Sequence, residues 1–70
     1  MSLSAGRGLL LDAQKQLLLE WSRLRESWTD QNADAFEKRY IDPVDGQVRR
    51  ATEAMERLAE IAAAARRACE

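Results

Sequence analysis

Few side chains in this sequence could carry out covalent or metal chemistry. The 70 residues include no His and a single cysteine, Cys69, so one chain can build neither an imidazole base, nor a thiolate and imidazole metal site, nor an internal disulfide. Asp42 and Asp45 form a carboxylate pair, but at a helix start such residues are better explained as a cap and a complement to the helix dipole. The sequence predicts a protein that is not an enzyme, with no catalytic residues, no cofactor and no metal.

The charge of the chain is nearly balanced, with 11 basic and 12 acidic residues. No long-range field would therefore attract it to nucleic acid or to an anionic membrane. Two arginine pairs could contact phosphates, but three glutamates on the same helical surface would repel a phosphate backbone; the pairs are Arg49-Arg50 and Arg66-Arg67, and the glutamates are Glu53, Glu56 and Glu60. No apolar run is long enough for membrane insertion, so the cytoplasm is the default compartment.

The elements that would position any functional surface are helices. Leu10, Leu17 and Leu24 alternate with Gln14, Trp21 and Trp28 in steps of four and three, which predicts a helix over residues 9–28. Residues 1–8, with two glycines, read as a flexible tail.

A second apolar stripe, again in steps of three and four, predicts a helix over residues 32–68 with a kink near Pro43. The other interpretation of Asp42-Pro43 is a stop followed by a new helix, with Asp42 as its N-cap. Cys69, at the end of the stripe, reads as a small buried hydrophobe or a frayed thiol, with an intermolecular disulfide as the minority alternative. The stripe consists of Phe36, Tyr40, Val44, Val48, Ala51, Met55, Leu58, Ala62, Ala65 and Cys69.

Residues 29–31 are predicted to form the corner between the two helices. Trp28 and Phe36 flank small and turn-forming residues, so the two rings can fill the space beside the bend. Asp30 can cap the second helix through its carboxylate. We expect the corner and core to consist of Trp21, Leu24, Trp28, Asp30, Phe36 and Tyr40.

The second helix should also carry a dimer interface. A first helix of about 20 residues spans about 30 Å and a second of about 37 residues spans about 55 Å, so the first cannot cover the whole second stripe. A chain of this size also needs support beyond one small core. The expected interface consists of Val48, Met55, Leu58, Ala62 and Ala65.

In order and spacing, Trp28, Asp30 and Phe36 resemble the corner of the WXG family, small helical hairpins of bacterial type VII secretion. That corner reads Trp-x-Gly followed by an aromatic eight positions after the Trp, and Asp30 stands at the Gly position. The resemblance continues over much of the second helix, with a Pro after Phe36 and then Val48, Met55 and Leu58.

The resemblance implies a homodimer, or a heterodimer with a similar small helical protein, recognised by a secretion ATPase of the FtsK and SpoIIIE type. It also implies export without a cleaved signal peptide. The expected fold is all-α, an antiparallel helical hairpin that dimerises into a four-helix bundle and acts as a protein-interaction module. The alternative function is a small regulatory helical dimer, antitoxin-like or associated with nucleic acid.

Overall fold

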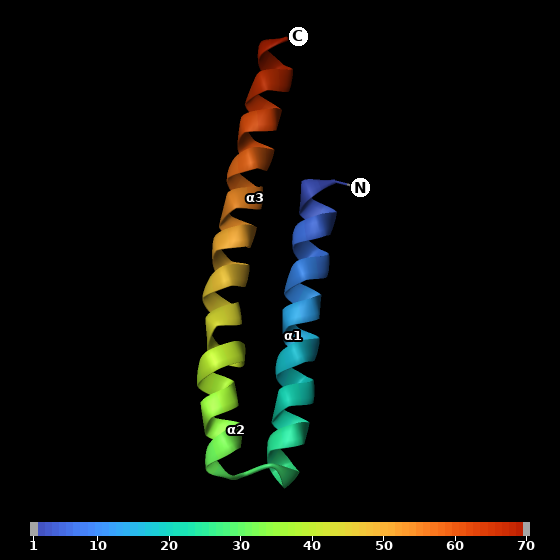
Figure 1. Ribbon diagram of the computed structural model, residues 1–70. Coiled ribbons are helices and arrows are strands. Elements are labelled where there is room, and N and C mark those ends of the chain that lie inside the picture. The colour runs from blue at the N-terminus through green and yellow to red at the C-terminus, as the bar shows by residue number, and fades with distance from the viewer. Residues whose placement is uncertain (1, 70) are drawn as a thin grey trace.

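The computed structural model describes residues 2–69, and within them the chain is helical except at one turn and at its ends. Helix α1 (Leu3–Ser27) is followed by α2 (Gln31–Phe36), a π-helical turn η1 (Glu37–Ile41) and α3 (Asp42–Ala68). Figure 1 shows two antiparallel arms side by side: α1 forms one, and α2, η1 and α3 form the other. The prediction of an all-α chain is confirmed.

The molecule is long and thin. Its extents are 60 × 17 × 10 Å and its radius of gyration is 17.1 Å, whereas a compact chain of this length would have a radius of about 11 Å. The end of α3 continues past the start of α1 (Figure 1). The core of the described residues therefore lies between two helical arms, with no third element covering it.

Helix α1 begins earlier than the sequence indicated. We expected a tail over residues 1–8 and a helix from Leu9, but the helix starts at Leu3, and Met1 lies outside the described residues. The Ser2 hydroxyl accepts a hydrogen bond from the Ala5 amide at 3.1 Å. Arg7 forms an ion pair with Glu56 of α3 at 2.8 Å. This cap and this contact to the second arm offset the low helix propensity of Gly6 and Gly8, about 1 kcal/mol each.

The corner lies at Trp28, Thr29 and Asp30, one residue earlier than the predicted 29–31. Trp28 leaves helical conformation, with φ −118° and ψ 95°. Asp30 is the N-cap of α2, and its carboxylate accepts a hydrogen bond from the Ala33 amide at 3.1 Å. No residue of the described chain has a positive φ, so this corner makes no demand for glycine at position 30.

Helical conformation continues through Pro43, as the unbroken apolar stripe indicated. The interpretation of Asp42 as an N-cap at a new helix start is wrong, because Asp42 has helical φ and ψ and no side chain caps α3. The Asp42 amide instead donates to the Glu37 carbonyl, five residues back, in the wide turn η1. A wide turn directly before Pro43 makes room where a proline ring would otherwise crowd the preceding turn.

The π-helical turn also keeps the second arm in register with α1. Ala33 and Ile41 are buried and Glu37 between them is half-buried, so this face repeats every four residues. In a regular α-helix each step of four overshoots a full turn by about 40°. Because a π-helical turn contains an extra residue, it reduces this drift and leaves Ala33 on the same side as Ile41.

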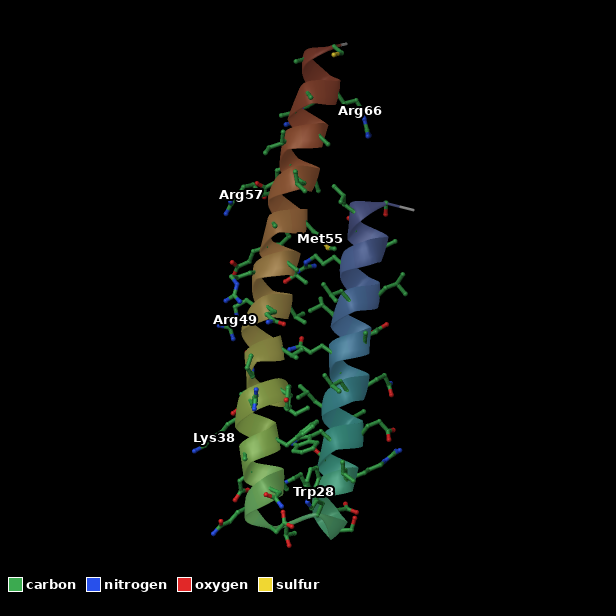
Figure 2. All side chains as sticks on the ribbon, in the orientation of Figure 1. Trp28, Lys38, Arg49, Met55, Arg57 and Arg66 are labelled. Carbon is green, nitrogen blue, oxygen red and sulfur yellow. The ribbon has the colours of Figure 1, made fainter. Side chains whose placement is uncertain are left out.

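Polar contacts tie the arms together along their line of contact, which we call the seam. The Gln14 amide donates to Asp45 at 2.9 Å, and the indole N–H of Trp21 donates to Glu37 at 2.5 Å. Figure 2 shows Met55 pointing towards α1, while Lys38, Arg49 and Arg57 project away from it. The buried residues of the seam are Trp21, Ala33, Ile41, Val48 and Thr52.

Candidate interaction surface

The aromatic side chains form one cluster next to the corner. Trp21 stacks on Phe36, with ring centroids 5.3 Å apart and an interplanar angle of 25°. Trp28 meets Trp21 edge-on at 5.9 Å and Phe36 at 5.7 Å. Tyr40 extends the cluster from Phe36 at 4.9 Å. The sequence therefore placed these four rings together correctly.

Trp21, and not Trp28, is the centre of this cluster. The Trp21 side chain is 7% exposed and its indole N–H is bonded to Glu37, whereas Trp28 is half-buried. Phe36 is 38% exposed and Tyr40 is 52% exposed. The cluster is therefore closed towards the seam and open towards solvent, so part of its aromatic surface remains available.

The guanidinium of Arg25 lies beside the aromatic cluster. It is 5.9 Å from the Trp21 ring centroid and forms an ion pair with Asp34 at 2.6 Å. This pair links the last turn of α1 to α2 across the corner. Arg39 lies over the Tyr40 ring at 5.4 Å on the exposed side.

Helix α1 exposes many leucines that lie outside the seam. Of the large apolar residues exposed by the chain, most belong to α1, with exposed fractions from 37% at Leu17 to 60% at Leu9. Leu24, which we expected in the core, is 47% exposed. These exposed leucines are Leu3, Leu9, Leu11, Leu17, Leu18, Leu19 and Leu24.

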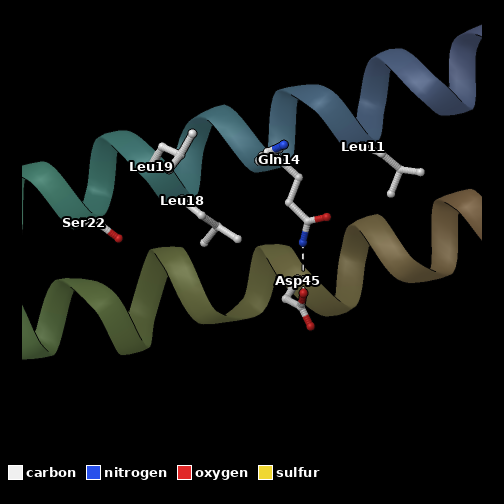
Figure 3. Close-up of a pocket in the computed structure, with 7 residues that line it drawn as sticks. Leu11, Gln14, Leu18, Leu19, Ser22 and Asp45 are labelled. Carbon is white, nitrogen blue, oxygen red and sulfur yellow. Dashed lines mark hydrogen bonds between the residues drawn. The ribbon is translucent and has the colours of Figure 1, made fainter.

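One flank of α1 forms a shallow groove with the second arm. Leu11, Leu18 and Leu19 line it from α1, and Asp45 closes it from α3 through its bond to Gln14 (Figure 3). Lys15 and Ser22 complete the lining. The groove is open and mixed in polarity, and no residue in it is an unpartnered buried charge.

The residues expected at a dimer interface fall into two groups. Val48 is 8% exposed and packs within the seam of its own chain, so little of its side chain is free to meet a partner. The reason is the length of α1, which begins at Leu3 and runs alongside α3 as far as the Arg7–Glu56 ion pair. Met55 is half-buried, while Leu58 is 54% exposed and Ala62 and Ala65 are also exposed.

Several residues of the seam were missed in the sequence. Ala33, Ile41 and Thr52 are buried, and the Thr52 hydroxyl is satisfied by donating to the Arg49 carbonyl at 3.0 Å. In a regular α-helix, residues spaced like Ala33 and Ile41 would not lie on the same side. The wide turn between them brings both to the seam. The step-of-four spacing directly before Pro43 was the signal that could have located Ala33 and Ile41.

The charged residues form surface pairs. Arg49 is paired with Asp45 at 2.7 Å, and Arg23 with Glu20 at 3.0 Å. Cys69 is an exposed free thiol at the C-cap of α3, so its interpretation as a buried hydrophobe is wrong. Within residues 2–69 there is no cluster of acidic and thiol side chains that could hold a metal ion. None of the helices in that range is long and apolar enough to cross a membrane.

No family model, curated protein or solved structure matches this chain.

Proposed function

We propose that this chain is a non-enzymatic protein-interaction module that functions when bound to another helical protein. The observation that carries the proposal is the exposure of apolar side chains along both arms. Leu17, Leu24 and Leu58 are between 37% and 54% exposed, and contiguous apolar surface on a small soluble domain marks a site of association.

The shape of the chain supports this function. Two antiparallel helices with an apolar face make half of a four-helix bundle, and the missing half is two further helices of similar length. A homodimer or a heterodimer with a similar small helical protein would supply them. Recognition would then depend on shape and on the aromatic cluster at the corner.

The proposed biological setting is type VII secretion, as a substrate or as the partner subunit of one. The support is the corner, where Trp28 and Phe36 bracket the turn as in the WXG family and their rings lie 5.7 Å apart. Asp30 takes the position of the family's Gly and acts there as the N-cap of α2. The larger partner in this setting is a secretion ATPase of the FtsK and SpoIIIE type.

Co-purification from the native cell tests this function. The tagged chain should recover a second small helical protein or an FtsK-like ATPase. A variant with a lengthened corner, carrying two glycines inserted between Thr29 and Asp30, should lose that partner while circular dichroism shows unchanged helicity. Recovery of only RNA, DNA or a toxin nuclease, with affinity that falls as salt is raised, would replace this proposal with the regulatory alternative.

A further inference from the structure

The second arm carries two stripes of residues that could each face α1. In the described structure the seam is occupied by the first stripe, in which Val48 and Thr52 are buried and Met55 is half-buried. Its positions follow one another in steps of four and three, so they lie along one side of the helix. The first stripe consists of Ile41, Asp45, Val48, Thr52, Met55 and Ala59.

The second stripe is the first one moved back by a single position. Tyr40 is 52% exposed and Leu58 is 54% exposed, while Val44 and Ala51 are half-buried. None of its members is charged, whereas the first stripe includes the carboxylate of Asp45, so the second is at least as well suited to burial. The second stripe consists of Tyr40, Val44, Gln47, Ala51, Ala54 and Leu58.

The wide turn η1 determines which stripe faces α1. The Asp42 amide donates to the Glu37 carbonyl, five residues back, so this turn holds one residue more than an α-helical turn. If the turn became α-helical, the residues after it would rotate by about 100° around the axis of α3, which equals one residue position. The first stripe would then leave the seam and the second would take its place.

The aromatic cluster would change little during this rotation. Glu37 is the first residue of η1, and its amide bonds back to carbonyls of α2, so α2 sets its direction. Its bond to the Trp21 indole and the stacking of Phe36 on Trp21 both precede the part of the chain that rotates. Tyr40 is the one member of the cluster that would move, from the exposed side towards α1.

The polar contacts that hold α3 in the described register are weak. Gln14 bonds to Asp45 at an exposed position (Figure 3). Arg7 pairs with Glu56 through side chains that are 41% and 52% exposed. Exposed contacts of this kind stabilise a fold only slightly. A second register with similar apolar burial would therefore be close to the first in free energy and populated beside it.

We propose that η1 is a register switch, at which α3 rolls by one residue position between the described register and a second one. In the second register η1 is α-helical and the stripe from Tyr40 to Leu58 packs on α1. The chain then covers with its own first arm the apolar stripe that the described register leaves accessible. A partner that binds this stripe would favour the described register, so the second register is a self-covered form. This regulatory role rests on the proposed interaction function, whereas the two registers do not.

A glutamate in each stripe tests for the two registers. Val48→Glu places a carboxylate in the seam of the described register only, and Val44→Glu places one in the seam of the second register only. Because an unpartnered buried charge is costly, each variant should adopt the register that leaves its glutamate in water. Each single variant should therefore stay helical, with a Tm within about 10 °C of the wild type. The double variant has no free register and should lose most of its helical circular dichroism.

Deleting Lys38 makes a matched background with one register. Lys38 lies within η1 and projects away from α1 (Figure 2), and without it the turn can close as a regular α-helix while the first stripe stays in the seam. In this background Val48→Glu should lower the Tm by at least about 20 °C, and Val44→Glu should remain tolerated. Deletion of Arg39, also within η1, serves the same purpose if the chain without Lys38 does not fold.

Thermal unfolding of all variants at one protein concentration provides the comparison. If Val48→Glu lowers the Tm equally with and without Lys38, the register switch is wrong. Recovery of a partner from cells is a separate measurement, in which the chain without Lys38 should recover at least as much partner as the wild type. Lower recovery would overturn the self-covered form. Recovery of no partner by either chain, with the expected pattern of Tm values, would overturn the proposed function and leave the two registers in place.

Discussion

Trp21 is the residue on which the fold of a single chain most depends. It is the one large aromatic that is almost fully buried, and it contacts Trp28, Phe36 and Glu37 at once. Truncating such a residue removes its apolar contacts and also leaves Glu37 without its indole donor.

We therefore expect Trp21→Ala to lower the free energy of unfolding by about 3–5 kcal/mol, which is enough to unfold most of a protein this small. Trp28→Ala should cost less, because its ring is only half-buried. Urea unfolding of both variants at one protein concentration, followed by circular dichroism, measures the difference. A loss at Trp28 equal to or greater than that at Trp21 would contradict the central position of Trp21.

The aromatic residues show what could be predicted at this scale. Their helical spacing identified all four members of the cluster, because residues three, four and seven apart lie on one side of a helix. Spacing could not rank Trp21 above Trp28. The ranking depends on Glu37, which reaches the Trp21 indole from the other arm, and a contact between arms depends on where the turn lies.

At the scale of elements, the corner depends on a cap. The Asp30 carboxylate accepts from the Ala33 amide at 3.1 Å, and Asp30 itself has extended φ and ψ. The Asp30 side chain thereby satisfies one of the amides that α2 cannot bond internally.

Asp30→Ala should lower the free energy of unfolding by about 1 kcal/mol, and Asp30→Gly by only a few tenths, because Gly tolerates the N-cap position. Asp30→Ser, which restores an oxygen acceptor, is the control and should be close to neutral. Thermal unfolding of the three variants provides the comparison. If Asp30→Gly were clearly more stable than the wild type, the corner would need backbone freedom and the cap would be of little importance.

The position of the helices was predictable, but two of their features were not. Helix propensity placed the start of α1 after Gly8, while the Ser2 cap and the Arg7–Glu56 pair extend it to Leu3. The continuous stripe predicted that the chain would stay helical through Pro43. It did not predict η1. The position of a wide turn depends on how the two arms pack against each other, and the periodicity of a single helix carries no information about that packing.

At the scale of the whole molecule, the length of the arms and the apolar faces point to association. Within residues 2–69, the core of one chain contains four buried apolar residues, Trp21, Ala33, Ile41 and Val48. A core of this size rarely provides more than about 3–5 kcal/mol. Burial of the exposed leucines by a second copy would add to this core.

The dependence of thermal stability on protein concentration tests this account most directly. If folding and dimerisation are coupled, raising the concentration 100-fold, from about 1 to 100 µM, favours the folded dimer by about 2.7 kcal/mol and should raise the Tm by about 5–10 °C. Circular dichroism at 222 nm measures this shift at one fixed salt concentration. The path length of the cell is shortened as the protein concentration is raised, so that the absorbance stays comparable. A Tm that stays constant over that range, with the mass of a monomer throughout, would contradict the central claim that this chain is completed by a second copy.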